Sequence, residues 1–338
     1  MKLLASVSAG LMFLSLVFLG DCGGNNTTAV EPSALDMQPE VSVRENALSP
    51  LILVADYSGH NILGYPLDSS GDQAPSFRIG GKRTGLGTPD NIALDRDDNI
   101  YTSVNGKTVS VFAAKSHGDA RPIRHIAGKR TQLKFPIGVA VDSNGYLYVA
   151  DCGYGDVKVF APGAHGNVAP IRVISLSSGC TISEAVDSKD NLWVTSGDNL
   201  ISEFSPESQG NNFLKEIQEP ESKGGDSIRS IAIDSRANIY AGNLLSRNIL
   251  VFSSSASGPA KPIRTIAGSK THLGAPSGLS LDSEDNLYVT VCHYCSNGSG
   301  TDSVLVFGAG ANGNIKPRAV ITGKKTKLDV PTYLALRK

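Results

Sequence analysis

Five short apolar segments, each closed by an aspartate, recur along the chain at nearly constant spacing. The aspartates are Asp95, Asp142, Asp187, Asp234 and Asp282, and successive ones are 47, 45, 47 and 48 residues apart. A period of this length, with several short β-rich segments per unit, is typical of a β-propeller, in which a blade buries its faces only by stacking against its neighbours. The spacing therefore predicts the fold class directly.

One unit, residues 136–180, shows what each repeat contains. Four β-rich runs (PIGVAVD, YLYVAD, VKVF and PIRVI) are separated by the turn-forming stretches SNG, CGYGD and APGAHGNVA. This pattern predicts a four-stranded antiparallel meander, with strands A to D running from the inside of the ring outward. The recurring aspartate follows strand A, where its carboxylate can accept backbone N–H groups of the A–B turn. We therefore interpret the five aspartates as turn formers and not as a catalytic set.

The two ends of the repeat region determine the number of blades. Residues 51–56 (LILVAD) match strand B, so the first unit lacks an inner strand, and residues 330–336 (VPTYLAL) match strand A. Five complete units and one assembled from both ends give an all-β, six-bladed propeller over residues 50–338. Closure by the C-terminal strand would also remove two exposed strand edges.

The region before the repeats indicates export. Residues 1–21 combine one Lys with an apolar run typical of a secretory signal peptide. Cys22 lies where a bacterial lipobox would place a lipidated cysteine, although Asp21 departs from that pattern, and ordinary cleavage is the alternative. Gly23 after the cysteine favours, by resemblance, the outer membrane. Residues 22–49 are polar and predict a flexible tether on the periplasmic side of the envelope.

The repeat units resemble NHL repeats, whose pattern is PxGxAxDxxGNLYVAD followed by VxVF. Residues 136–151 (PIGVAVDSNGYLYVAD) and 276–290 (PSGLSLDSEDNLYVT) carry the resemblance best, which extends over residues 51–338. The fourth unit departs from it, with Thr181 in place of Pro, Glu184 inside strand A and the single Trp at 193. The resemblance implies a six-bladed scaffold whose relatives include binding modules and metal-dependent lactonases and lyases, so it specifies the fold more than the function.

Composition narrows the classes of function. The formal net charge is −1, which together with export argues against nucleic-acid binding. The sequence contains no GxSxG elbow, no HExxH helix and no phosphate-binding loop. We expect a monomer without a cofactor, which touches the membrane only through an N-terminal lipid. His117 and His165 fall in C–D turns on the face opposite the channel mouth.

Four cysteines remain besides Cys22. Cys152 opens the B–C loop of the third blade and Cys180 follows its strand D, so both lie on one face and a disulfide between them is reasonable. Cys292 and Cys295 share the B–C loop of the sixth blade as CHYC and could close a small ring. A metal or redox site is the alternative for this CxxC, although a single pair is a weak signal.

Ligands of propellers usually bind on the face of the B–C and D–A loops, around the channel mouth. At the end of strand B the six blades carry mostly short polar residues, namely Asp56, Ser103, Asp151, Ser196, Asn243 and Val291. A gluconolactonase-type metal site would use Glu, Asp and Asn ligands, for which Glu184, Asp151 and Asn243 are the candidates. The alternative for Glu184 is an inner-strand carboxylate that is hydrated or hydrogen-bonded to backbone, and we predict no metal.

Two other groups of residues suggest binding on that face. At the seam between blades six and one, Asp56, Tyr57, His60, His293, Tyr294 and Tyr333 could hold a small polar ligand. Four D–A loops (GGKRTGL, AGKRTQL, AGSKTHL and TGKKTKL) carry a recurring set of cations that we call the basic collar: Lys82, Arg83, Lys129, Arg130, Lys270, Lys324 and Lys325. Such a collar would attract anionic partners, although charges copied with the repeat are the simpler explanation.

These observations favour a non-enzymatic, envelope-associated binding protein that presents a propeller face to an anionic or polar ligand or to a protein. The alternative is a periplasmic metal-dependent lactonase or hydrolase of the gluconolactonase-like propeller type.

Overall fold

The computed structural model describes residues 48–176, 179–197, 199–219, 228–293, 295 and 301–338. Residues from Ala47 to Lys338 form one compact unit. The predicted signal peptide, Cys22, the tether up to residue 47 and Tyr294 lie outside the described residues. No helix in the described ranges is long and apolar enough to cross a membrane.

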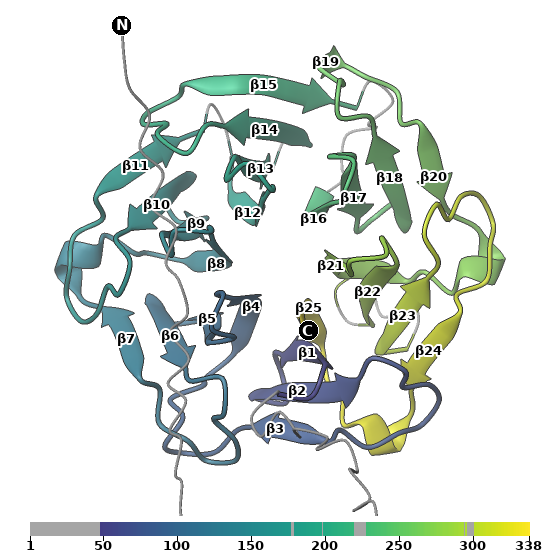
Figure 1. Cartoon of the computed structure of the whole chain (residues 1–338), viewed down its shortest axis with the longest axis horizontal. Coiled ribbons are helices and arrows are strands. Elements are labelled where there is room, and N and C mark those ends of the chain that lie inside the picture. Colours follow the sequence, from purple (N-terminus) through teal and green to yellow (C-terminus); the bar gives the residue numbers. More distant parts are fainter. Residues whose placement is uncertain (1–47, 177–178, 198, 220–227, 294, 296–300) are drawn as a thin grey trace, which may run out of the picture. The chain divides into compact units, whose positions relative to one another are not determined.

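Six antiparallel sheets stand around a central axis, as predicted (Figure 1). The strands are given from the axis outward. Blade one consists of β25 (Pro331–Arg337), β1 (Leu51–Asp56), β2 (Asn61–Pro66) and β3 (Phe77–Ile79). Blade two consists of β4 (Pro89–Leu94), β5 (Ile100–Val104), β6 (Thr108–Phe112) and β7 (Arg124–Ala127), and blade three of β8 (Pro136–Val141), β9 (Leu147–Asp151), β10 (Asp156–Phe160) and β11 (Arg172–Ser175).

Blades four to six continue the ring in the same way. Blade four consists of β12 (Thr181–Val186), β13 (Leu192–Ser196), β14 (Leu200–Phe204) and β15 (Phe213–Gln218), and the short β19 (Gly258–Pro259) pairs with β15. Blade five consists of β16 (Ile228–Ile233), β17 (Ile239–Asn243), β18 (Asn248–Phe252) and β20 (Arg264–Ile266). Blade six consists of β21 (Ala275–Leu281), β22 (Leu287–Cys292), β23 (Ser303–Phe307) and β24 (Ala319–Thr322).

The last strand closes the ring. β25 pairs antiparallel with β1, in a register that places Leu53 opposite Ala335 and Val54 opposite Leu334. Backbone hydrogen bonds also join the segment after β1 to the segment before β25: Tyr57 N donates to Val330 O and Ser58 N to Asp329 O, both at 3.1 Å. Closure by the C-terminal strand is therefore confirmed, and the edge of β1 is covered.

The recurring aspartates form the A–B turns, as predicted. In blade three, Asp142 Oδ1 accepts the N–H groups of Asn144 and Tyr146, both at 2.9 Å. Asp282 does the same for Glu284 and Asn286 in blade six. The carboxylate replaces hydrogen bonds that the turn cannot make with strand partners, which is why this residue type recurs at this position.

Adjacent blades share their apolar cores. Tyr65 of blade one is buried with Val304 and Val306 of blade six, and Phe204 of blade four is buried with Tyr148 and Ala150 of blade three. A blade removed from the ring would thus expose both of its faces, which is the physical reason why repeats of this period occur together.

An outer belt of backbone pairing links all six blades. At each junction a glycine of one C–D loop pairs in parallel with an isoleucine of the preceding strand D; the glycines are Gly71, Gly118, Gly166, Gly210, Gly258 and Gly313. Each of these glycines has a φ between 61° and 75°, a left-handed conformation that favours glycine. The C–D loops thus fold back onto the neighbouring blade, a contact that the repeat pattern does not predict.

Candidate binding face and central channel

The four basic D–A loops share one geometry. Residues after strand D form a tight turn, assigned as 3-10 helices η1 (Lys129–Thr131), η2 (Ser269–Thr271) and η3 (Lys324–Thr326) in three of the loops. In each loop the buried threonine donates its hydroxyl to the glycine that opens the turn; the four donors are Thr84, Thr131, Thr271 and Thr326. The threonine therefore fixes the turn from inside, and the neighbouring cations face outward.

A side-chain bond from the next blade holds each turn. Asp119 accepts from Arg83 N at 2.6 Å, Asn167 from Arg130 N at 2.8 Å and Asp72 from Lys325 N at 2.6 Å. Asn314 accepts from Lys270 N in the same way. These bonds use only backbone N–H groups, so the ammonium and guanidinium groups stay available for a partner.

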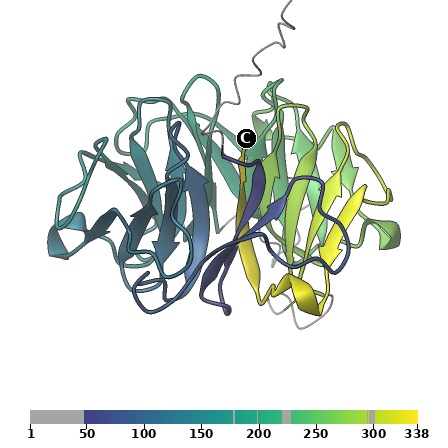
Figure 2. The same cartoon turned by 60° about the horizontal axis from the view of Figure 1, so that its bottom comes forward.

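All seven collar side chains are exposed. None takes part in the three salt bridges found among the described residues. The four loops follow blades five, six, one and two, so they occupy four consecutive junctions and form one arc. Figure 1 shows the 3-10 turns at the outer edge of the ring, and Figure 2 shows them on the side away from the C-terminus. The basic collar therefore lies along an arc on the outer rim of the ring.

The residues at the ends of strands B do not form an open polar ring. Asp56, Ser103 and Asp151 are 0% exposed, and the other three positions are also buried. Asp151 accepts from Lys134 N at 2.6 Å and from Phe135 N at 2.7 Å, so its carboxylate anchors the incoming D–A segment.

Lys158 completes a buried ionic cluster in blade three. Its ammonium lies 3.2 Å from Asp151 Oδ2 and 2.5 Å from Asp156 Oδ1, and its side chain is 1% exposed. It also lies 4.6 Å from the ring centroid of the exposed Tyr154. A buried ammonium needs such partners because its desolvation is costly. No signal in the repeat pattern had distinguished Lys158.

Asp56 occupies the equivalent place in blade one with fewer partners. Its Oδ1 accepts from Asp329 N at 2.6 Å, and its Oδ2 has no hydrogen-bond partner among the described residues. Burial, with a smaller contribution from the charge of Asp329, raises the pKa of Asp56 to about 7. The Asp56 carboxyl, at the seam, therefore binds a proton more tightly than an ordinary aspartate.

The stability of the protein should consequently depend on pH through Asp56. Because the folded state binds this proton more tightly than the unfolded chain, the free energy of unfolding falls as pH rises from about 4 to about 7. Asp56→Asn places an uncharged Nδ2–H₂ donor where the protonated carboxyl has Oδ2, and should remove up to about 4 kcal/mol of this fall. Urea unfolding of both proteins between pH 4 and 8 measures the effect, and parallel curves would contradict it.

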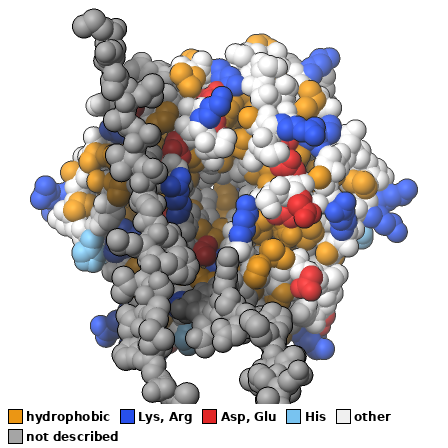
Figure 3. Space-filling model, in the orientation of Figure 1, with side chains coloured by type: hydrophobic (Ala, Val, Ile, Leu, Met, Phe, Trp, Pro, Cys, Tyr) orange, Lys and Arg blue, Asp and Glu red, His pale blue; other side chains and the backbone are white. Residues whose placement is uncertain are grey.

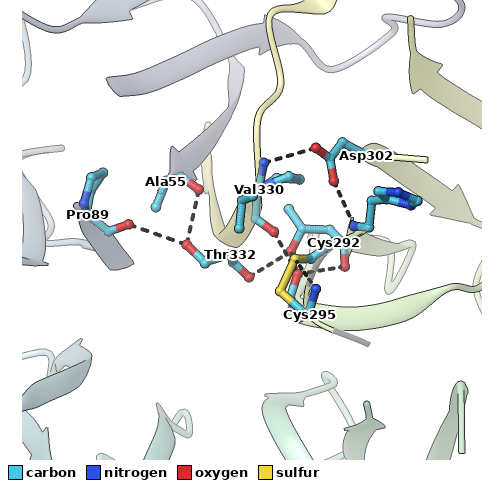
Figure 4. Close-up of a disulfide and its surroundings, with 11 residues drawn as sticks. Ala55, Pro89, Cys292, Cys295, Asp302, Val330 and Thr332 are labelled. Atoms are coloured by element: carbon cyan, nitrogen blue, oxygen red, sulfur yellow. Dashed lines mark hydrogen bonds between the residues drawn. A yellow bond between two sulfur atoms is a disulfide. The ribbon is translucent and has the colours of Figure 1, made fainter. Parts of the chain in front are cut away.

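The predicted seam site is only partly assembled. His60 is exposed and its Nδ1 contacts Gly87 O, whereas His293 donates its backbone N–H to Asp302 at 2.7 Å. Asp302 also accepts from Val330 N, so this carboxylate ties the B–C loop of blade six to the closing segment (Figure 4). Tyr57 is half-buried. Of the side chains expected to hold a ligand here, that of Asp56 instead bonds the closing segment through Asp329 N.

Tyr333 lies inside the channel and not at its mouth. Its side chain crosses from blade one, and its hydroxyl donates to Arg229 O of blade five and lies 3.4 Å from Ile182 O of blade four. The residue is 6% exposed. Tyr333 therefore obstructs the channel and links opposite blades.

Both predicted disulfides are present. Cys152 pairs with Cys180, and Cys292 pairs with Cys295. Figure 4 shows the second disulfide near the closing segment. Thr290 donates to Thr332 O of β25, and Asp302 accepts from Val330 N, directly before this strand. The pairing of Cys292 with Cys295 leaves neither thiolate available to bind a metal.

The three candidate metal ligands do not form a donor set. Asp151 is used by backbone N–H groups and Lys158, and Asn243 Oδ1 accepts from Ser246 N at 3.1 Å. Glu184 Oε1 accepts from Ala150 N at 3.2 Å, in the wall between blades three and four. No group of three or more His, Cys, Asp or Glu side chains in the described residues is arranged to hold a metal ion. The residues therefore do not fit the metal of a lactonase.

No protein-family model and no curated protein matches this sequence. Among solved structures, a protein of unknown function from Bacteroides caccae is similar over 86% of this chain and 100% of its own, with a TM-score of 0.64 and 12% sequence identity. At that identity the likeness shows the fold alone. The NHL resemblance and the lipoprotein signal stay predictions from the sequence.

Proposed function

We propose that this protein is a non-enzymatic binding protein of the cell envelope, which holds an anionic polymer such as an acidic polysaccharide against the basic collar. The observation that carries the proposal is the repeated loop geometry. Four consecutive junctions present exposed cations, while the backbone beneath each is fixed by a buried threonine and an Asp or Asn of the next blade.

An extended partner suits this arrangement better than a small one. The loops that carry the cations lie along an arc on the outer rim (Figure 1). One small anion would therefore contact one loop, whereas a polymer would contact several loops at once. Binding to several weak sites on one scaffold raises the overall affinity without any single deep pocket. Export through residues 1–21, and attachment through Cys22, would place this rim on the periplasmic side of the envelope.

Charge reversal tests the proposal. Replacing Lys82, Arg83, Lys129 and Arg130 by Glu should weaken retention on an acidic polysaccharide by at least about tenfold at low salt, because the change inverts half of the arc. Added salt should reduce the difference between mutant and parent. The exposed positions predict only small changes in stability.

A matched variant controls for net charge. Replacing Arg96, Lys189, Arg236 and Lys316 by Glu makes the same change of charge at exposed positions outside the collar. This variant should retain the polysaccharide nearly as well as the parent. Equal losses in both variants would show that net charge and not the basic collar governs retention. Retention of both variants at parental strength would show that the basic collar does not bind the polysaccharide.

The hydrolase alternative has its own test. Ca²⁺, Mg²⁺, Mn²⁺ or Zn²⁺ would raise the melting temperature if the protein held such an ion tightly, since a ligand that binds only the folded state stabilises it. We expect no rise with any of the four. A clear rise that Glu184→Gln abolishes would favour the metal-dependent hydrolase over the binding protein.

A further inference from the structure

The central channel holds a cavity that opens on the face opposite the basic collar. Its volume is about 450 Å³, within the range of small-molecule sites. The walls are the strands A of all six blades, and the lining extends from Asn91 and Ser183 to Leu336 and Lys338 at the C-terminal ends of these strands. Figure 3 shows this face, with hydrophobic side chains around the centre of the ring.

The walls of the cavity are mostly aliphatic. The strand position occupied by Ile92 in blade two carries Val139, Ile231, Leu279 and Leu334 in blades three, five, six and one. Two residues further along each strand, nearer the opening, the lining includes Leu94, Val141, Val186, Ile233 and Leu281. A molecule in this channel would therefore bury an apolar body.

The inner end of the cavity is closed by Tyr333. Its hydroxyl reaches the backbone carbonyls of Ile182 and Arg229 across the channel, so the ring spans the space between opposite blades. Tyr333 is itself one of the lining residues. Tyr333 thus obstructs the channel at the inner end of the cavity.

Glu184 is the one acidic group in the wall among the described lining residues. It takes the place that aliphatic side chains occupy in the other blades, and it is 6% exposed. Its carboxyl fits beside Gly138, where a Cβ would meet Oε2. Oε1 accepts from Ala150 N, and Oε2 has no hydrogen-bond partner among the described residues. An unpaired buried oxygen is costly, and a ligand could satisfy it.

We propose that this cavity is a second binding site, for a small aliphatic molecule with one neutral hydrogen-bonding head group that reaches Glu184. This site goes beyond the polysaccharide-binding function and uses the other face of the ring.

The charges around the cavity select the head group. Burial raises the pKa of the Glu184 carboxyl well above its usual range, which favours the protonated form that can donate to a hydroxyl or carbonyl oxygen. A second hollow of about 420 Å³ adjoins the opening and is lined by Asp95, Asp98 and Asp142, besides Arg96 and Lys338. Three carboxylates near the entrance disfavour an anionic head group.

Binding of three probes to the full chain tests the proposal. The probes n-hexanol, n-hexylamine and hexanoate share one apolar chain and differ in the head group. Isothermal titration at pH 7 should show saturable binding of hexanol, with hexylamine and hexanoate each at least about fivefold weaker, because either charged head group would lose its hydration in the cavity. An absence of saturable hexanol binding, or equal or tighter binding of either charged probe, would overturn the proposal.

Two variants locate the site. Glu184→Leu should weaken hexanol binding about fivefold to tenfold, by removing the hydrogen bond. Val186→Trp, at a half-buried position near the opening, should block all three probes and leave the fold intact, as circular dichroism will show. Unchanged hexanol binding in a folded Val186→Trp variant would overturn the site. Retention on acidic polysaccharide should not change in either variant, so the cavity and the basic collar are tested independently.

Discussion

A chain that stops after Asp329 should not accumulate as a soluble, cooperatively folded monomer. The truncation removes β25, which covers the whole edge of β1 from Leu51 to Asp56. It also removes Tyr333, Leu334 and Ala335, all of which are buried. Each large apolar side chain contributes about 1.5 to 3 kcal/mol by burial, and the lost strand pairing adds to this. The total is comparable with the 5 to 15 kcal/mol that typically stabilises a folded domain.

Removal of Lys338 alone is the matched control. This residue is exposed and lies beyond the last strand residue, Arg337. The shorter deletion should give the parental yield and melting temperature. Size-exclusion chromatography and circular dichroism distinguish the two results. A truncated chain that elutes as a monomer and unfolds cooperatively near the parental temperature would contradict the role assigned to β25.

Lys158→Ala should reduce the free energy of unfolding by about 3 to 5 kcal/mol, the usual cost of breaking a buried ion pair from one side. The substitution leaves Asp151, which is 0% exposed, without the ammonium that lies 3.2 Å from it. It also removes the partner of Asp156. Urea unfolding at pH 7 measures this change.

Two comparisons separate the ion pair from other contacts of Lys158. Lys134→Ala removes a cation that also stacks on Tyr154, at 5.1 Å, but this side chain is exposed, so about 1 kcal/mol or less should be lost. The double variant Lys158→Met with Asp151→Asn removes both charges and should be more stable than Lys158→Ala. A loss below about 1 kcal/mol in Lys158→Ala would show that backbone N–H groups alone stabilise Asp151.

Contacts within one blade were predictable from the sequence. The A–B turn aspartates, the four-stranded meander and the disulfide between Cys152 and Cys180 join residues of a single repeat, and the pattern of that repeat specifies them. Closure by β25 was predictable too, because the two ends carry complementary parts of one unit. Local period and turn chemistry are sufficient for features of this kind.

Contacts between blades were not predictable in the same way. Gly118 pairs with Ile79 of the preceding blade, and Tyr333 reaches Ile182 on the far side of the channel. The outer position of the basic collar follows from this folding back of the C–D loops. These contacts depend on the position of one repeat relative to another in the closed ring, and nothing in a single repeat encodes that position. Lys158 is an exception within one blade: its partners Asp151 and Asp156 lie on β9 and β10 of the same sheet, but nothing in the repeat pattern distinguishes this residue.

Glu184 shows how the structure changes an interpretation. The sequence marked it as a departure from the repeat and as a candidate metal ligand. Its carboxyl instead lies in a space that Gly138 leaves free, with the backbone of Ala150 as its partner. A carboxyl in this position suits a neutral hydrogen-bonding group better than a metal ion, and the inference about the channel rests on that difference.

Both proposed binding faces depend on the ring that β25 closes, because closure determines which loops share a rim. Cysteines at positions 53 and 335, which are paired across β1 and β25, should form an intramolecular disulfide in a full chain that also carries Cys22→Ser. Cysteines at 53 and 336 should not form one, because adjacent residues of a strand point to opposite faces. Peptide mapping by mass spectrometry under non-reducing conditions identifies the link. We expect efficient linkage of 53 to 335 in the monomer; equal linkage in both pairs, or linkage only between separate chains, would contradict closure of the ring by β25.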